Sequence, residues 1–265
     1  MLDLTDIIPS VRDLVNRVAG FISSQVNQVS MAQIEEKSKN SLVSFVDKQA
    51  EIRLVEGLRN IIPGSTFLTE EGTVEQQKGE WRWIIDPLDG TTNFLHGIPV
   101  FAISVALQFR GTTALGIVHE IGQNEQFYAW EQGGAWCNGR PIRVAAASSM
   151  DQALIATGFP YYDYKRIAGY LDVLESLMRD TRGVRRCGSA AVDLAYVAAG
   201  RYNAFFEYSL HPWDVAAGAF IVLEAGGVVT DFKGENNFLF GKEVIAGGAI
   251  IHACLLETIQ SAFFR

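Results

Sequence analysis

The sequence WIIDPLDGTTNF at residues 83–94 constrains the fold of this chain more than any other stretch. Its apolar start, residues 83–85, predicts a buried strand. Pro87 fixes its own φ angle and pushes Asp86 toward an extended conformation, so we expect the strand to end at Asp86. An acidic side chain therefore stands where the chain must leave the sheet.

The residues after this strand have the composition of a combined metal and phosphate site. Asp89 follows Asp86 by three positions, and Gly90 allows a tight turn and a close approach of the backbone to a ligand. Thr91 and Thr92 suit a helix N-terminus, whose N–H groups favour an anion. Carboxylate oxygens favour Mg²⁺ over softer metals. An isolated D-P-x-D would more simply be an Asp-Pro turn with an Asp cap, but the full string favours the ligand site.

Three segments resemble signatures of the inositol monophosphatase family. Residues 83–94 match its pattern W-[IV]-[IV]-D-P-[IL]-D-G-T-x-N-F, and FLTEEG at residues 67–72 resembles its glutamate segment just upstream. WDVAAG at residues 213–218, continuing to EAGG at residues 224–227, resembles its distal signature. The order and intervals also fit, so the resemblance covers nearly the whole chain. It implies an α/β (α+β) fold, a layered α-β-α-β-α sandwich with the site between two halves, usually in a dimer.

The resemblance implies a set of metal ligands. These are the side chains of Glu70, Asp86 and Asp89, the carbonyl of Leu88, and Asp214 as a ligand to a second ion. The residues alone do not choose between Glu70 and Glu71. The family pattern prefers Glu70 as the direct ligand and leaves Glu71 for the shell behind it.

Asp47 and Thr91 are the residues that the resemblance assigns to positioning and deprotonating the attacking water. Asp47 also completes a capping box with Ser44 at the start of a predicted helix, and both roles can hold at once. The loop around residues 33–44 departs from the family pattern, because Ser41 lies in a stretch where members often carry an acidic residue. We expect this loop to bind any additional, weaker metal differently.

The resemblance further implies contacts to the substrate. They involve Gly90, Thr91, Thr92, Gly188, Ser189, Ala190, Glu207 and Asp214. A carboxylate such as Glu207 can accept hydrogen bonds from adjacent hydroxyl groups of an inositol ring. The residues alone leave simpler alternatives open: Glu207 as a polar residue at a strand end, and Ser189 as the N-cap of a helix.

Carboxylates gathered in this way require cations. Two of them about 4 Å apart repel by roughly 4 kcal/mol at an effective dielectric constant of about 20. Paired Mg²⁺ ions relieve this repulsion, polarise a phosphate ester and activate a water molecule, so no protein nucleophile is needed. The haloacid dehalogenase phosphatases instead use a nucleophilic Asp in a D-x-D-G-[TV] loop, whereas this chain has D-x-x-D with a Pro after the first Asp.

Composition indicates a compact enzyme with a small-molecule partner. The 265 residues are 48% hydrophobic, enough for a large core, and the net charge of −8 argues against a nucleic-acid partner. The start, MLDLTD, is acidic where a signal peptide needs positive charge, and no apolar run reaches membrane-spanning length. Three scattered cysteines, Cys137, Cys187 and Cys254, are expected to be reduced. We expect a cytoplasmic protein without membrane contact, and a homodimer by family likeness.

Periodicity predicts two halves, residues 1–150 and residues 151–265, that form one compact unit. In the first half, helices over residues 4–29 and from residue 45 onward precede strands of a meandering sheet, near residues 66–69, 81–86, 100–109, 113–120 and 125–131. In the second half we expect helices over residues 164–178, 189–199 and 213–225 and a strand over residues 203–206.

The sequence thus predicts a Mg²⁺-dependent phosphomonoesterase that hydrolyses inositol monophosphate by a metal-activated water, with two or three Mg²⁺ ions and inhibition by Li⁺. Related phosphatases act on fructose 1,6-bisphosphate, 3'-phosphoadenosine 5'-phosphate, histidinol phosphate or NADP, and these substrates remain alternatives. A catalytically idle metal-binding or scaffold protein is a further alternative, against which the complete set of acidic residues counts.

Overall fold

The computed structural model describes residues 3–29, 34–38, 41–160 and 163–264. For residues 34–38 and 41–43 it describes the backbone alone. The side chain of Ser41, on which the expectation about a weaker metal depends, lies outside the described residues. None of the described helices is both long enough and apolar enough to cross a membrane.

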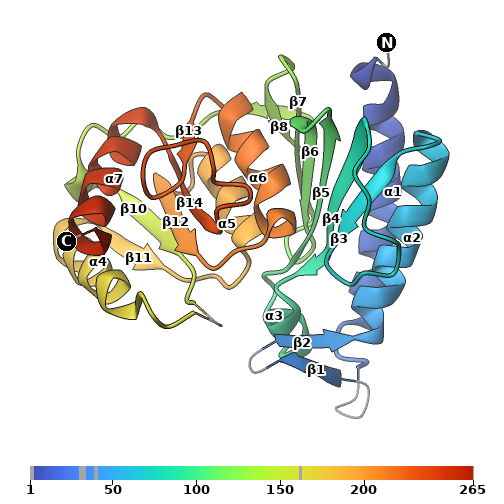
Figure 1. Ribbon diagram of the computed structural model, residues 1–265, viewed down its shortest axis with the longest axis horizontal. Helices are drawn as coiled ribbons and strands as arrows, with labels where there is room; N and C mark the ends of the chain where they lie inside the picture. The colour runs from blue at the N-terminus through green and yellow to red at the C-terminus, as the bar shows by residue number, and fades with distance from the viewer. Residues whose placement is uncertain (1–2, 30–33, 39–40, 161–162, 265) are drawn as a thin grey trace.

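The elements form five layers, α-β-α-β-α (Figure 1). One outer layer holds α1 (Leu4–Gln25) and α2 (Phe45–Ile61), and the other holds α4 (Ile167–Asp180) and α7 (Ala249–Phe263). Between the two sheets lie α5 (Ala190–Ala198) and α6 (Pro212–Glu224). The predicted layered fold is therefore confirmed.

The larger sheet has seven strands in the order β3-β4-β5-β6-β7-β8-β9. They are β3 (Thr66–Thr69), β4 (Trp81–Asp89), β5 (Ala102–Phe109), β6 (Thr112–Glu120), β7 (Glu125–Trp130), β8 (Ala135–Cys137) and β9 (Arg140–Ile142). From β4 onward each strand is antiparallel to the next, which confirms the predicted meander. The parallel partner of β4 is β3, so the carboxyl ends of these two strands meet at one edge of the sheet.

The smaller sheet has the order β11-β10-β12-β14-β13. Its strands are β11 (Gly183–Arg185), β10 (Leu154–Thr157), β12 (Ala204–Tyr208), β14 (Glu243–Gly247) and β13 (Val228–Thr230). The remaining elements are the hairpin of β1 (Ile34–Ser38) and β2 (Ser41–Ser44), the short helix α3 (Thr91–Leu95) and a 3₁₀ turn at Met150–Gln152.

Several boundaries differ from the sequence prediction. The strand expected to stop at Asp86 continues to Asp89, because a bulge between these residues interrupts the pairing with β5 and accommodates Pro87. Helix α1 stops at Gln25, and Asn27 then adopts a left-handed φ of 61°. The loop expected around residues 33–44 contains the β1–β2 hairpin, and β13, β14 and α7 were not predicted.

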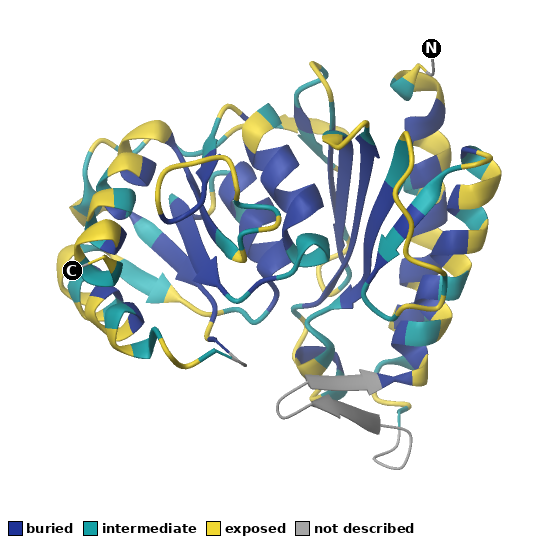
Figure 2. Ribbon diagram, in the orientation of Figure 1, coloured by how far each residue is buried: buried dark blue, intermediate teal, exposed yellow. Residues whose placement is uncertain are grey.

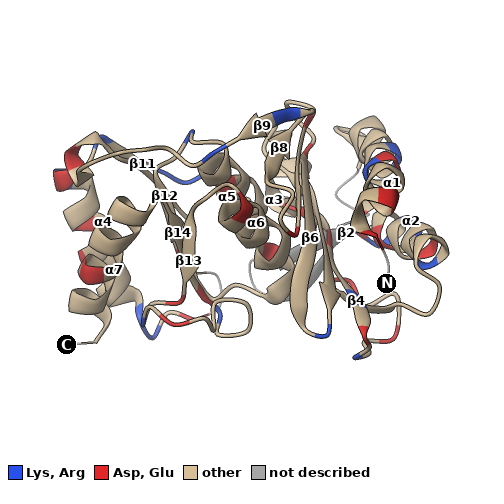
Figure 3. Ribbon diagram, turned by 90° about the horizontal axis from the view of Figure 1, so that it is seen from above, with Lys and Arg blue, Asp and Glu red and all other residues tan. Residues whose placement is uncertain are grey.

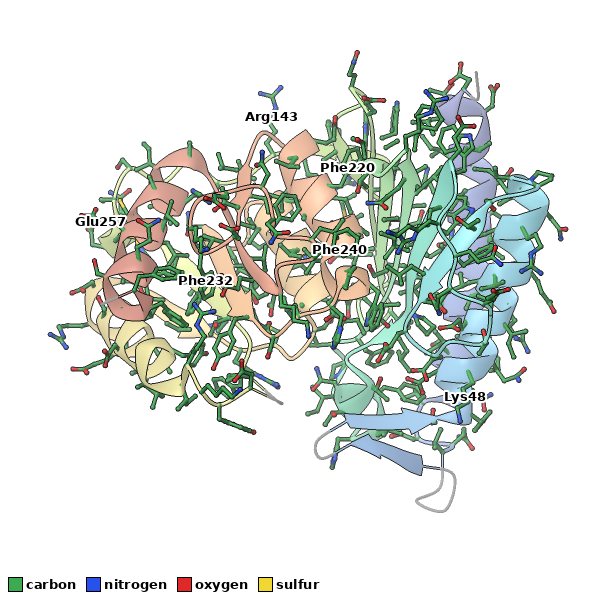
Figure 4. All side chains as sticks on the ribbon, viewed as in Figure 1. Lys48, Arg143, Phe220, Phe232, Phe240 and Glu257 are labelled. Carbon is green, nitrogen blue, oxygen red and sulfur yellow. The ribbon has the colours of Figure 1, made fainter. Side chains whose placement is uncertain are left out.

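The core is divided between the layers. Figure 2 shows buried residues along both sheets and around the central helices, with exposed residues on the outer sides of α1, α2, α4 and α7. Helices α5 and α6 are apolar on nearly all sides because both faces are covered by sheets. Both acidic and basic residues lie along α1 and α2 (Figure 3). Phe232, labelled in Figure 4, belongs to the outer cluster that packs against α7.

His119 on β6 is a buried histidine that affects stability. It is 3% exposed, and burial lowers its pKa to about 4. The unfolded chain binds a proton at this residue below about pH 6.5, whereas the folded protein stays neutral there until about pH 4. The contribution of neutral His119 to the stability of the fold is therefore complete above pH 6.5 and is lost as the pH falls toward 4.

We predict that the free energy of unfolding of the wild type, relative to His119→Gln, falls between pH 7 and pH 4.5. This change in free energy approaches about 3 kcal/mol, because the pKa of His119 differs by roughly two units or more between the unfolded and folded states. Urea unfolding at both pH values measures it, and His96→Gln, which removes an exposed histidine, serves as the control. Parallel pH profiles for wild type and His119→Gln would contradict this prediction.

Candidate active site

A cavity of about 140 Å³ lies where residues of the two sheets and the central helices meet. The structure brings to this cavity most of the residues that the sequence singled out. Its lining includes Glu70, Asp86, Leu88, Asp89, Gly90, Thr91, Gly188, Ser189, Ala190, Glu207 and Asp214. Residues from distant parts of the chain thus converge as the motifs predicted.

The bulge in β4 sets the positions of the first two aspartates. Asp86 is 2% exposed, and its Oδ1 accepts a hydrogen bond of 2.9 Å from the backbone N–H of Leu88. Gly90 follows with a left-handed φ of 91°, and a Cβ there would lie 3.0 Å from the carbonyl oxygen of Val100. This glycine is needed both for the turn and for the close approach of the chain.

Asp89 connects β4 to the first turn of α5. Its Oδ2 accepts 2.6 Å and 2.7 Å hydrogen bonds from Ser189 Oγ and from the backbone N–H of Ala191. Ser189 is also the N-cap of α5, since its Oγ accepts from the N–H of Val192. The structure therefore gives Ser189 two roles in holding the site, in addition to its place in the cavity wall.

Asp214 lies in the first turn of α6, as the Pro at the start of this helix suggests. Its Oδ2 accepts a 2.7 Å hydrogen bond from the backbone N–H of His211. From the larger sheet, Ser104 Oγ donates to the carbonyl of Trp213 over 3.0 Å. Like Asp86 and Asp89, Asp214 has one oxygen held by a protein donor, which orients its other oxygen.

The carboxylates raise one another's pKa. Burial and the charges of Glu70, Asp89 and Asp214 raise the pKa of Asp86 well above its usual value. Burial, followed by the charges of Asp89 and Glu70, does the same to the pKa of Asp214. Burial raises the pKa of Asp89 to about 6, against the opposing effect of its hydrogen bonds. The site strongly favours added positive charge.

Hard oxygen donors of this kind fit a divalent cation such as Mg²⁺. Among the described cavity residues, Arg186 is the single Lys or Arg side chain, so the protein supplies little compensating charge. The Asp86 carboxyl hydrogen-bonds to those of Glu70 and Asp214. In that arrangement, no three His, Cys, Asp or Glu side chains of the described part of the chain form a ready metal-ligand set. The donor chemistry nevertheless fits the ion.

Asp47 lies behind the cavity wall and reaches it through Thr91. The Thr91 hydroxyl is 2.9 Å from Asp47 Oδ1 and 3.0 Å from the carbonyl oxygen of Leu88. The other oxygen of Asp47 accepts from both the N–H and the Oγ of Ser44, which forms the predicted capping box. Burial raises the pKa of Asp47 despite these bonds. The cap and the contact with Thr91 therefore coexist.

Glu51 is a buried residue that the sequence analysis missed. It is 0% exposed on α2, one turn after Asp47, and holds the segment that carries Glu70. Its carboxylate accepts from Thr69 Oγ1 and Glu71 N, and from both donors of Thr73, over 2.7–2.9 Å. The one available signal was an acidic side chain on the apolar face of a predicted helix.

Besides Asp47, two of the predicted site residues lie outside the cavity lining: Thr92, expected to contact the substrate, and Glu71, expected in the shell behind the ligands. Thr92 is exposed on α3, and Glu71 contributes its backbone N–H to Glu51 rather than to the cavity wall. Asn93, next to Thr92, is buried instead and donates to the carbonyls of Val100 and Cys187 over 2.7 Å and 2.9 Å. It thereby connects α3 to the segment before α5.

Glu207 lines the cavity from β12 of the smaller sheet, whereas the β4 aspartates belong to the larger sheet. It is 7% exposed on β12, and burial followed by the charge of Asp193 raises its pKa well above the usual value. Asp193, which was not predicted, is 1% exposed on α5 and also lines the cavity. The cavity therefore has an acidic end beyond the candidate metal ligands.

Comparison with known proteins places this geometry in a family. The chain matches the model of the Inositol monophosphatase family over residues 3–262. It is 42% identical over 250 residues to a Pseudomonas aeruginosa protein named Nus factor SuhB, with 92% of each chain covered. It is 40% identical over 240 residues to an inositol-1-monophosphatase from Mesorhizobium japonicum, with 90% of each chain covered.

Solved structures agree. The extragenic suppressor protein suhB from Bartonella henselae has a TM-score of 0.91 at 37% identity, over 96% of this chain and 98% of that one. An IMPase from Thermotoga maritima has a TM-score of 0.88 at 34% identity, over 98% of both chains. Since the family model, the relatives and these structures all span nearly the whole chain, this chain belongs to the inositol monophosphatase family, a family of phosphatases that are generally metal-dependent.

Proposed function

We propose that this protein is a Mg²⁺-dependent phosphomonoesterase that hydrolyses inositol monophosphate to inositol and phosphate. The observation that carries the proposal is the convergence of Glu70, Asp86, Asp89 and Asp214 in one cavity, with the Thr91–Asp47 pair at its wall. A polyol phosphate fits the part of the lining formed by Glu207, which can accept hydrogen bonds from hydroxyl groups.

The four carboxyl groups and the carbonyl of Leu88 would hold the metal. The bound ions supply Lewis-acid polarisation of the phosphate and a lower pKa for an attacking water. The protein donors on Asp86, Asp89 and Asp214 fix one oxygen of each side chain, so the other oxygen points in a defined direction. Such hydrogen bonds hold the ligand oxygens in fixed positions before the metal binds.

Thr91 and Asp47 would handle the proton of the attacking water. A threonine hydroxyl can accept a hydrogen bond from the water while it donates its own proton to the carboxylate of Asp47. The 2.9 Å separation of Thr91 Oγ1 and Asp47 Oδ1 suits this transfer. Because Ser44 occupies the second oxygen of Asp47, the acceptor is directed at Thr91.

The phosphate would lie against the turn from Gly90 to Thr91, and the inositol ring against Glu207 and the segment from Gly188 to Ala190. Fructose 1,6-bisphosphate, 3'-phosphoadenosine 5'-phosphate, histidinol phosphate and NADP are the competing substrates. All except histidinol phosphate carry additional phosphate charge, and among the described cavity residues Arg186 is the single Lys or Arg side chain that could pair with it. By family likeness we also propose two halves, 1–150 and 151–265, in one unit, a cytoplasmic homodimer and inhibition by Li⁺.

A second candidate function comes from the relative at 42% identity, which is named a Nus factor. The net charge of −8 gives this chain no broad attraction for nucleic acid, so such a role would act through protein contacts. The test is whether a hydrolytically inactive variant still replaces the Pseudomonas aeruginosa protein in a strain that lacks it. Replacement would separate this role from hydrolysis.

We predict that Asp89→Asn abolishes turnover. The change removes a charge from the metal site. Because loss of even a residue that only hydrogen-bonds to a metal ligand typically lowers metal affinity or activity by about 10- to 100-fold, we expect kcat/KM to fall by at least about 100-fold. Phosphate release from inositol 1-phosphate and calorimetric titration with Mg²⁺ measure the effect. The control is Asp151→Asn, an exposed carboxylate away from the cavity. Retained Mg²⁺ affinity in Asp89→Asn would exclude Asp89 as a ligand.

Glu207→Ala should change substrate choice rather than chemistry. Loss of hydrogen bonds to a charged group is expected to raise KM for inositol 1-phosphate by about 10- to 100-fold. Turnover of phenyl phosphate, which offers no hydroxyl groups on its ring, should stay within about twofold. An equal loss for both substrates would refute a role of Glu207 in specificity.

A further inference from the structure

Gly158, directly after β10, lines the cavity and has no role in the function described above. A Cβ built on this residue would lie 2.0 Å from Glu207 Oε2, 2.1 Å from its Cδ and 2.2 Å from its Oε1. These are its three nearest atoms, and all belong to one carboxyl group. The Glu207 carboxyl therefore occupies the volume that any other residue at position 158 would fill.

The pairing of strands β10 and β12 places Gly158 beside Glu207. Strands β10 and β12 are parallel neighbours, with Thr157 paired to Phe206, so Gly158 and Glu207 are the next residues on adjacent strands. Gly158 has no left-handed φ, so its conformation is open to other residues. Space for Glu207, rather than backbone geometry, is what glycine supplies here.

Phe159, the next residue, adds a flat apolar surface at the same wall. Its side chain is 45% exposed and lines the cavity. The ring meets Tyr170 edge-on at 89°, with centroids 6.3 Å apart, and the Arg186 guanidinium lies 5.2 Å from its centroid. These contacts hold an exposed aromatic ring in one orientation.

We propose that Gly158 and Phe159 determine substrate specificity, by selecting an uncharged ring with hydroxyl groups as the leaving group. This inference rests on the proposed function. Gly158 lets the Glu207 carboxyl form the polar part of the wall, and the Phe159 ring contacts the apolar C–H face of the substrate ring. A second phosphate at this wall would meet the carboxyl groups of Glu207 and of the buried Asp193. Arg186 is the single guanidinium among the described residues that line the cavity, so such a substrate is disfavoured.

Gly158→Ala tests the first element. We expect KM for inositol 1-phosphate to rise at least about 10-fold, because the methyl group displaces Glu207, with kcat and phenyl phosphate hydrolysis within about twofold. In the Glu207→Ala background the same substitution should have no effect, because the space is then free. Additive effects in this cycle, or an unchanged KM in Gly158→Ala, would overturn the proposal.

A stability cycle gives a readout independent of activity. Gly158→Ala should lower Tm by at least about 4 °C in the wild type and by none in Glu207→Ala, where relief of the clash leaves only the favourable Gly→Ala effect. An equal loss in both backgrounds would show that Gly158 does not act through Glu207. If the wild type hydrolyses no phosphate ester, the proposed function fails. The stability cycle still shows whether Gly158 makes room for the Glu207 carboxyl.

Phe159→Ala tests the second element. It should raise KM for the two ring substrates, inositol 1-phosphate and phenyl phosphate, by about 5- to 10-fold, and leave the acyclic glycerol 2-phosphate unchanged. Phe240→Ala is the matched control, because Phe240 (Figure 4) is 56% exposed and does not line the cavity. Equal losses on all three substrates, or none, would overturn the role of Phe159.

Discussion

The hydrogen bonds that Asp89 accepts from the start of α5 are the contacts on which the site depends. They run from Ser189 Oγ and the Ala191 N–H to one carboxylate oxygen, and they join residues a hundred positions apart in the chain. The larger sheet and the central helices are thus held together at a charged group, where a helix N-terminus favours negative charge. The β4 carboxylates face α6 and β12 because this connection fixes the two parts together.

The sequence predicted the parts of the structure that local rules control. The apolar run before Asp86, the Pro at the start of α6 and the capping box of Ser44 and Asp47 all appear where expected. Each depends on residues within one or two turns of each other, so its pattern is visible in a short window. The gathering of Asp86, Asp89, Glu70 and Asp214 came instead from the family resemblance, since no local pattern states that distant segments meet.

The missed features depend on contacts between elements. The position of Glu51 on the apolar face of a helix marked it as unusual, but its role became visible only with Thr69 of β3 and Thr73 of the following turn as its partners. Gly158 follows a short strand and carries no turn signal, and its significance arises from the neighbouring β12. The extension of β4 past Pro87 likewise requires β5, because the bulge is defined by the pairing it interrupts. In each case the partner is an element that the local sequence does not specify.

The burial of so many carboxyl groups forms the site but lowers the stability of the fold. Asp86, Asp47, Asp193, Glu51 and Glu207 are each at most 7% exposed, and burial is the largest cause of the raised pKa of Asp86, Asp47, Asp193 and Glu207. The hydrogen bonds that Asp86, Asp47 and Glu51 accept offset part of this cost, and the apolar packing of α5 and α6 between two sheets stabilises the fold against the remainder. A cation that binds only the folded chain stabilises it further by mass action. The carboxyl groups whose burial destabilises the fold would therefore couple folding to the binding of such a cation.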